Sequence, residues 1–317
     1  MAVGVHHLLT GGDPGQATGK VMTAEEAVGR FVRPGAVVGM GGQNINRCPM
    51  ALVHEVARQG VGDLTVVGCN LSLPLDLLVA AGLVVRTEQG SGNLERYGTL
   101  FAWRRAVEAG RVAVADHSHL TMASRFTAGA NGVPFLPTRS LLGSDVLAAL
   151  VAEGIAQVMD DPWGDGPVVL VRALRPDVSL IHAHRADPFG NVVIEGVTSH
   201  EVDMVRASAA TVVTVEEIVP EGELNARPEE VTISGAYVSA VVAQPFGAFP
   251  TSVYRRYDFA EDEIKAYQAL ARHGDGTYAS WLADHVLNPA DFDGYLRRAD
   301  PGGARRAALT ESMRSHV

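Results

Sequence analysis

Short apolar runs alternate with stretches of helical period along this chain of 317 residues, and this alternation limits the folds that it can adopt. Residues 36–40, 64–67 and 83–86 are predicted strands, and helical stretches such as 49–58 lie between them. Strands joined by helices form a mostly parallel sheet with helices on both faces. A turn between two apolar segments, at residues 187–191, predicts a hairpin. We therefore predict an open, mostly parallel α/β sheet with an inserted β-hairpin.

Composition argues against several classes of protein. The formal net charge of −10 disfavours a general nucleic-acid-binding surface, which needs a basic face. The longest apolar runs, such as residues 146–152, are too short to cross a membrane, and the first 20 residues lack the pattern of a secretory signal. Two cysteines, Cys48 and Cys69, are too few for a disulfide framework and fit no metal-ligand spacing. The sequence therefore predicts a cytoplasmic protein without a metal site.

Three segments are distinguished by their residue patterns. Residues 1–20 mix glycine, aspartate, proline and glutamine without periodicity, so we predict a flexible leader. The folded domain is predicted to cover residues 21–299, and its first helix begins with a Thr23–Glu26 capping box. The basic segment 300–317 is predicted to be a flexible tail.

A glycine-rich loop follows the first predicted strand, with the sequence Gly39-Met40-Gly41-Gly42-Gln43. Glycines let the main chain turn at positive φ and let another group approach it closely. The spacing matches neither the dinucleotide fingerprint nor the phosphate-binding P-loop. Gly41, Gly42 and Gln43 therefore form either a tight strand-to-helix turn or a contact surface for a small acyl or phosphate-bearing ligand.

The second candidate stretch is Glu88-Gln89-Gly90-Ser91-Gly92, which follows another predicted strand. Open α/β sheets bind their ligands at the carboxyl ends of strands, so Gly90, Ser91 and Gly92 are candidates for substrate contact. A serine hydroxyl and a glycine amide can hold a carboxylate, although a plain loop with a capping serine has the same sequence. Glu88 is either an exposed loop glutamate or a second carboxylate in the site.

The third candidate stretch, Asp116-His117-Ser118-His119, again lies between a strand and a helix. Histidine titrates near neutral pH and can act as an acid or a base on a bound substrate. The two histidines alternate, so an extended segment would direct both to one side. A metal site is disfavoured because no third ligand is indicated. We expect one histidine to cap the helix and the other to face the site, with Ser118 beside it.

Two further residues are candidates for the pocket, and a pair of histidines is not. Arg125, in the helix that follows, can meet a substrate carboxylate or a phosphate, although helical arginines are mostly solvated. Ser144, after Gly143, is a second candidate. His182 and His184 lie on a predicted strand and are expected to be structural.

Several stretches, taken together and in order, resemble one known family. The chain is similar over about residues 21–299 to the α subunit (also called the A subunit) of family I CoA-transferases, most closely of the glutaconate CoA-transferase type. The stretches that carry the resemblance are Gly39-Met40-Gly41-Gly42, Gly62-Asp63-Leu64-Thr65-Val66-Val67, Val133-Pro134-Phe135-Leu136-Pro137 with Leu142-Gly143-Ser144-Asp145, Ile181-His182-Ala183-His184-Arg185-Ala186-Asp187-Pro188-x-Gly190, Thr211-Val212-Val213-Thr214-Val215-Glu216-Glu217-Ile218 and Gln244-Pro245-x-Gly247-Ala248-x-Pro250-Thr251-Ser252.

The resemblance implies a homologous β subunit, an α2β2 assembly and an active site between the subunits. It implies CoA transfer from an acyl-CoA to a carboxylic acid through a glutamyl-CoA thioester, with the glutamate supplied by the β subunit. Coenzyme A is then a substrate, and no cofactor is permanently bound. The resemblance also implies that Ser91-Gly92 faces the acyl group. Because the glycine-rich loop is expected at the same strand-end edge, the amides of Gly41 and Gly42 are candidates to stabilise an oxyanion or to contact the thioester. Glu88-x-Gly90 is similar to the Glu-x-Gly of the β-subunit nucleophile.

At one point the sequence departs from the glutaconate type. Ser118-His119 stands where that pattern has Ser-Gln, and related ring-cleaving hydrolases of the same fold carry a catalytic glutamate near this place. An alternative function is therefore a CoA-thioester hydrolase or lyase that uses His119. A third is a ligand sensor or sugar-phosphate binder of the same broad superfamily, although the negative charge disfavours a sensor that binds DNA.

Overall fold

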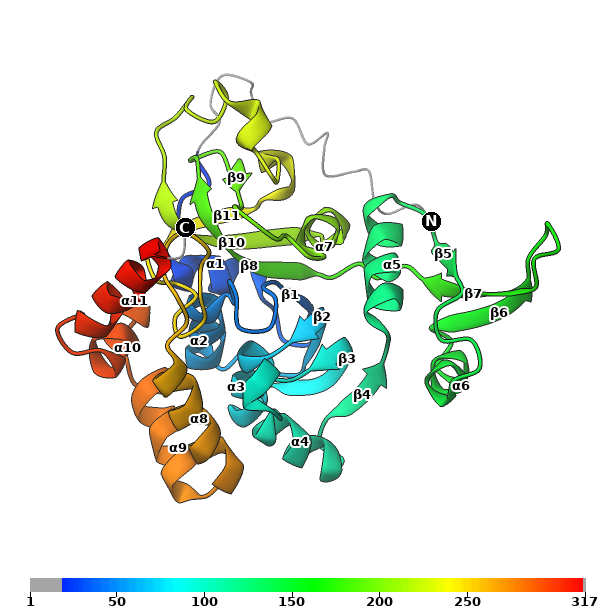
Figure 1. The fold of residues 1–317 in the computed structure, drawn as a ribbon, viewed down its shortest axis with the longest axis horizontal. Helices are drawn as coiled ribbons and strands as arrows, with labels where there is room; N and C mark the ends of the chain where they lie inside the picture. The colour runs from blue at the N-terminus through cyan, green and yellow to red at the C-terminus, as the bar shows by residue number, and fades with distance from the viewer. Residues whose placement is uncertain (1–18, 316–317) are drawn as a thin grey trace.

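The body of the protein is an eight-stranded sheet (Figure 1). The computed structural model describes residues 19–315. The strands of this sheet are β1 (Val37–Met40), β2 (Leu64–Leu71), β3 (Val84–Gly92), β4 (Ala113–Asp116), β8 (Val178–Ala186), β9 (Val192–Val193), β10 (Ala210–Ile218) and β11 (Ala240–Ala243). Their order is β11-β10-β8-β1-β2-β3-β4, with every neighbouring pair parallel, and β9 pairs antiparallel with β8. The predicted fold class and the inserted hairpin are both confirmed.

Helices cover both faces of this sheet (Figure 1). One face packs against α1 (Ala24–Phe31), α2 (Met50–Gln59), α3 (Leu73–Ala80) and α4 (Phe101–Glu108), and the other against α5 (His119–Ala130) and α7 (Glu201–Ala207). Each face has its own apolar core: Leu52 and Leu78 belong to the first, and Phe126 and Val205 to the second. The Thr23 capping box at the start of α1 forms as predicted. None of the helices in residues 19–315 is both long and apolar enough to span a bilayer.

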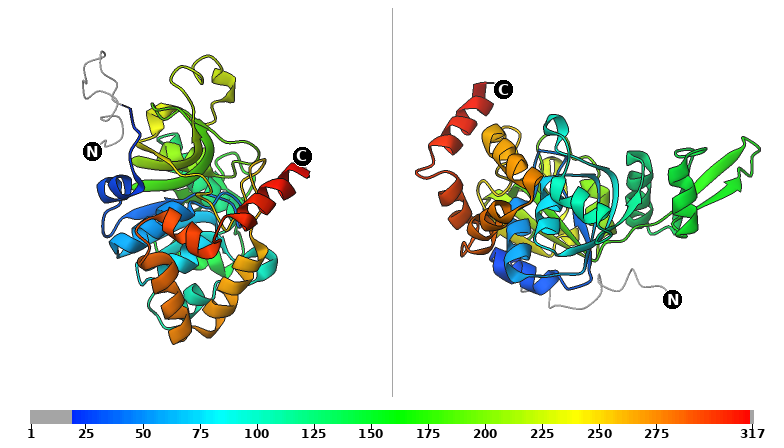
Figure 2. Two further views of the ribbon diagram at one scale, coloured as in Figure 1. Left: turned by 90° about the vertical axis from the view of Figure 1, so that its left-hand side faces the viewer. Right: turned by 90° about the horizontal axis from the view of Figure 1, so that it is seen from below.

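Residues 133–172, which we call the arm, form a separate small unit that projects from the body (Figures 1 and 2). The arm contains β5 (Phe135–Thr138), α6 (Asp145–Ala152), β6 (Ala156–Asp160) and β7 (Pro167–Arg172). Its three strands are antiparallel in the order β5-β7-β6. Sequence reasoning missed β6, because four of the five β6 residues are exposed and leave no apolar period to detect.

The carboxyl-terminal segment packs on the α2–α4 side of the body (Figure 1). It consists of α8 (Glu261–His273), α9 (Gly276–Leu282), a π-helical turn (Ala283–Leu287), α10 (Phe292–Ala299) and α11 (Ala304–Ser315). Helix α11 occupies most of the segment predicted to be a flexible tail. The buried carboxylate of Asp300 accepts hydrogen bonds from the N–H groups of Arg305 (3.1 Å) and Arg306 (2.9 Å), which fixes the start of α11. Of the predicted leader, residues 1–18 lie outside the described part of the chain.

Candidate functional site

The carboxyl ends of β1, β2, β3 and β4 lie at one edge of the sheet, because these strands are parallel neighbours. The register pairs Gly39 with Val67, Leu71 with Gly92, and Gln89 with Asp116. The glycine-rich loop after β1, the end of β3 and the start of α5 are therefore adjacent. Open α/β sheets bind ligands at such an edge.

Ser91 and His119 meet at this edge. The Nε2 atom of His119 lies 3.0 Å from Ser91 Oγ, and Ser91 Oγ donates to Asn70 Oδ1 at 3.0 Å. With the serine proton directed to Asn70, His119 is the donor to Ser91. The stretch 88–92, predicted to follow a strand, is itself part of a strand, because β3 pairs with β2 as far as Leu71. Sequence reasoning missed Asn70, since its role depends on the register of β2 against β3.

Ser118 begins helix α5, which separates the two neighbouring histidines. Ser118 Oγ accepts from the N–H of Thr121 at 3.1 Å, so the serine caps the helix, and the prediction of a capping histidine is wrong. Because His119 is the first helical residue, the segment is not extended. His119 is exposed, whereas His117 is buried. Within the described residues no group of three or more His, Cys, Asp or Glu side chains could hold a metal ion.

A buried charge cluster lies beneath α5. Glu88 accepts from Arg125 Nη1 at 2.6 Å and from Arg86 Nε at 3.0 Å, and Arg125 Nη1 also lies 2.9 Å from His117 Nε2. Burial alone would raise the pKa of Glu88, but the two guanidinium groups outweigh it and hold that pKa below its usual value. Burial and the Arg125 charge lower the pKa of His117 to about 3.

The cluster corrects two expectations. Glu88 is 8% exposed and Arg125 is 4% exposed, so the glutamate is not an exposed loop residue and the arginine is not solvated. Arg125 also donates through Nε to the Arg172 carbonyl at 3.1 Å. In this structure neither side chain is open to a ligand, because each satisfies the other.

The glycine-rich loop turns its amides toward the protein. The Gly41 N–H donates to the Leu180 carbonyl, the Gly42 N–H to Glu201 Oε1, and the Gln43 N–H to the Asn46 carbonyl, each at 2.8 Å. The expectation that the amides of Gly41 and Gly42 stabilise an oxyanion is therefore not met here, since acceptors within the chain already occupy them.

A buried ion pair that sequence reasoning missed holds this loop. Arg47 and Glu201 are both fully buried, with Arg47 Nη2 2.5 Å from Glu201 Oε2. Arg47 also donates to the carbonyls of His182 (3.2 Å) and Val197 (2.7 Å). No sequence signal distinguishes this pair from surface charges, because the partners are 154 positions apart.

The remaining candidates lie elsewhere. Ser144 caps α6 on the arm, where its Oγ accepts from the Leu147 N–H at 3.3 Å and donates to the Leu141 carbonyl at 2.7 Å. His182 and His184 are buried and hydrogen-bonded within the protein. They fit the structural role expected of them.

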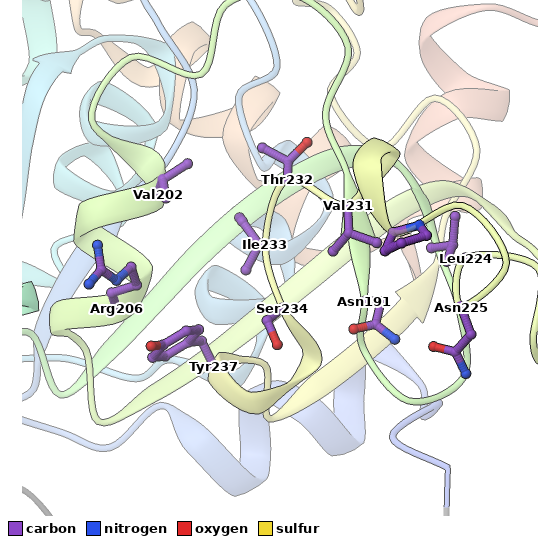
Figure 3. A pocket seen from close by; sticks show the side chains of 11 residues that line it. Asn191, Val202, Arg206, Leu224, Asn225, Val231, Thr232, Ile233, Ser234 and Tyr237 are labelled. Carbon is purple, nitrogen blue, oxygen red and sulfur yellow. The ribbon is translucent and has the colours of Figure 1, made fainter.

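A pocket of about 450 Å³ opens between α7 and the segment that precedes β11 (Figure 3). Val202 and Arg206 of α7 face Ile233 and Tyr237 across it. None of the predicted site residues lines this pocket. It is therefore separate from the cluster at the ends of β1–β4.

The chain matches the model of a known family, Coenzyme A transferase, over residues 21–244. The chain belongs to the coenzyme A transferase family. Within this family, the A subunit of glutaconate CoA-transferase from Acidaminococcus fermentans is 32% identical in an alignment of 298 positions that covers 88% of this chain and 91% of that one. The crystal structure of glutaconate coenzyme A-transferase from the same organism superposes with a TM-score of 0.84 at 30% identity, covering 89% of this chain and 93% of that chain.

Other relatives of this CoA-transferase family member carry different names. The A subunit of 3-oxoadipate CoA-transferase from Pseudomonas knackmussii is 32% identical, covering 89% of this chain and 99% of that one. A cholesterol ring-cleaving hydrolase IpdA subunit of Rhodococcus jostii is also 32% identical, covering 80% and 87%. An uncharacterized protein of Archaeoglobus fulgidus is 38% identical over 90% of this chain, but the match spans only 63% of that protein.

Proposed function

We propose that this chain is the α subunit of a heteromeric CoA-transferase that moves CoA between an acyl-CoA and a carboxylic acid. In this proposal the nucleophile is a glutamate of a homologous β subunit, which carries CoA as a glutamyl thioester. Support comes from the family match and from two relatives that are each named as the A subunit of a CoA-transferase. CoA acts as a substrate, no cofactor is permanently bound, and the assembly is α2β2 and cytoplasmic.

The position of Glu88 carries the proposal. Glu88-x-Gly90 is the stretch of this chain that is similar to the nucleophile motif, yet its carboxylate points into the cluster with Arg86 and Arg125. A carboxylate nucleophile must reach the thioester carbonyl, and two arginine partners stabilise its ground state. Because Glu88 is buried and paired with two arginines, it is poorly placed for this attack, which supports a glutamate of the partner as the nucleophile.

The chemistry of the proposed reaction defines what this chain must supply. The glutamate oxygen attacks the thioester carbonyl, the carbon–sulfur bond breaks, and the CoA thiolate then attacks the resulting anhydride at the glutamyl carbonyl. This releases the first acid, and a second carboxylate reverses the sequence. Each addition forms an oxyanion that requires hydrogen-bond donors. Ser91 and His119 lie at this open edge, and each can supply such a donor by turning its polar hydrogen away from its present partner, Asn70 for Ser91 and Ser91 for His119. Gly90 and Gly92 add no side chains at this end of β3.

The mechanism is tested by trapping the thioester. The chain is co-purified with the product of the adjacent gene, incubated with an acyl-CoA, treated with borohydride or hydroxylamine, and measured by intact-protein mass. We expect the modification on a glutamate of the partner and an unmodified Glu88 here. Absence of an adduct on either chain contradicts the transferase mechanism. Turnover of acyl-CoA by this chain alone contradicts the heteromeric assembly.

A second candidate function, a CoA-thioester hydrolase or lyase, is favoured by one observation. His119 is an exposed histidine hydrogen-bonded to a serine at the sheet edge, where it can activate water. One relative is named a ring-cleaving hydrolase subunit. His119→Gln separates the two functions: a transferase should keep its rate within a few fold, whereas a hydrolase that uses His119 should lose at least about a hundredfold. His273→Gln, at an exposed histidine of α8, is the matched control.

A further inference from the structure

The arm carries an open sheet edge along β6. Within the described residues β6 pairs only with β7, and the hydrogen bonds Arg172 N–H to Ile155 O and Asp161 N–H to Gly166 O fix which residues face that partner. Ile155, Gln157, Met159 and Asp161 point their main-chain groups toward β7. The alternate residues, Ala156, Val158 and Asp160, therefore point their N–H and C=O groups outward.

Strand β6 carries no lysine, proline or bulge that would hinder pairing at its open edge. Natural edge strands carry lysine, proline or bulges, whereas β6 has the sequence Ala-Gln-Val-Met-Asp and regular pairing with β7. Val158 is 46% exposed and Met159 is 43% exposed. The arm also holds half of the fourteen exposed large apolar side chains of the described residues: Val133, Phe135, Leu142, Val151, Val158, Met159 and Trp163. Such a concentration marks a surface that another protein covers.

We propose that two copies of this chain associate by pairing β6 with β6, antiparallel, about a twofold axis at Val158. In this register Val158 lies opposite Val158 of the second copy, and Ala156 lies opposite Asp160. All three outward-facing residues then form hydrogen-bonded pairs, and no like charges oppose each other. The contact is self-complementary, as a closed twofold dimer requires. The two three-stranded sheets become one six-stranded sheet.

The hairpin tip and a groove at the other end of β6 complement each other in the same arrangement. Trp163, in the turn between β6 and β7, is 88% exposed. Residues beyond Asp160 of one copy run alongside residues before Ala156 of the other. A groove of about 440 Å³ lies there, lined in part by Phe135, Ile155 and Leu170. The groove therefore offers apolar surface for the Trp163 of the second copy.

Charge supports the same pairing. The hairpin tip carries Asp160, Asp161 and Asp165. Arg139 is the cationic partner of the last two, at long distances of 3.9 Å from Asp161 and 4.0 Å from Asp165. The groove includes the exposed Arg172, whose guanidinium has no acidic partner among residues 19–315. The acidic tip thus lies near the unpaired Arg172, while Glu153, which this register also places beside the tip, is already paired with Arg86. The inference goes beyond the proposed function, because this contact requires no β subunit.

Cross-linking tests the register directly. Val158→Cys places two thiols opposite each other at the axis, where facing Cα atoms of an antiparallel pair are about 5.5 Å apart and within the range of a disulfide. Asp160→Cys is the matched control, because its own copy lies four residues away along the strands, roughly 13 Å. The native Cys48 and Cys69 are buried. Under mild oxidation we expect a cross-linked dimer for Val158→Cys and none for Asp160→Cys. Equal cross-linking of both variants, or of neither, overturns the proposal.

Light scattering of the full chain after size exclusion provides an independent measurement. Val158→Pro removes an outward N–H without touching the β7 ladder, and Trp163→Ser empties the groove. Each should raise the dimer dissociation constant at least about tenfold, whereas Leu287→Ser, an exposed apolar residue of the carboxyl-terminal segment, should leave it unchanged. A monomeric wild-type chain, or a dimer unaffected by both arm variants, contradicts the inference.

Discussion

The ends of β1 and β3 lie at the same sheet edge and are both rich in glycine. The end of β1 is closed to a ligand by contacts within the protein, whereas the end of β3 is open. After β1, Gly41 lies against Ile181 and Glu201, Gly42 lies against the main chain of residues 46–48, and both amides are bonded within the chain. At the end of β3, Ser91 remains at the surface beside His119. A glycine therefore indicates that another group approaches the main chain closely. It does not indicate whether that group belongs to a ligand or to the protein itself.

Arg47→Met should cause the largest loss of stability, because it removes the ion pair that holds the glycine-rich loop after β1. Removal of the guanidinium leaves the carboxylate of Glu201 buried without its charge partner, which costs about 3–5 kcal/mol of the free energy of unfolding. Urea unfolding measures this loss. Arg227→Met, at a half-exposed ion pair with Glu223 and Glu230, should cost less than about 1 kcal/mol. Equal losses in the two variants would show that the buried pair does not hold the loop. Adding Glu201→Leu to Arg47→Met should recover part of the stability.

Gly90→Ala should have the next largest effect, at the open end. A Cβ there would lie 2.5 Å from His119 Cδ2 and 2.9 Å from the Cys69 carbonyl, so the start of α5 must shift. We expect a loss of about 1–3 kcal/mol in the free energy of unfolding, and a weaker contact between His119 and Ser91. Urea unfolding checks the first, and the activity of the complex with its partner checks the second. Unchanged stability would mean that α5 does not rest on Gly90.

The sheet and its strand-end edge could be predicted, because a parallel sheet leaves a local signature of buried runs separated by helices. Ser91 and His119 could be proposed because strand ends gather at one edge. The burial of Glu88, Arg125 and Arg47 could not be predicted. The sequence does not distinguish a charged residue that is exposed to solvent from one that forms an ion pair inside the protein. The conformation of the glycine-rich loop could not be predicted either. The groups that accept hydrogen bonds from the amides of Gly41 and Gly42 lie more than 130 positions away in the sequence.

His117, which is buried beneath the end of β3, should make the free energy of unfolding depend on pH. Its pKa falls from 6.5 to about 3 on folding, so between these values the unfolded chain binds a proton that the folded protein does not. Stability is then complete above pH 6.5 and decreases as the pH falls, by about 1.4 kcal/mol per pH unit for this group. His117→Asn should reduce the slope of unfolding free energy against pH by that amount. Identical slopes in the variant and the wild type would exclude this contribution.

Gly92→Ala should have the smallest effect on stability and the most informative effect on function. Its Cβ would lie 2.9 Å from Gln89 Nε2 and 3.1 Å from Gln89 Oε1, the movable end of a side chain, so a rotation can relieve the contact. The stability change should stay below about 0.5 kcal/mol. If Gly92 lies against the acyl group, the variant should still lose activity, because the added methyl enters the space of the substrate rather than of the protein. A stable variant with full activity in the complex would remove Gly92 from the site and leave Gly90, Ser91 and His119 as the candidates at that strand end.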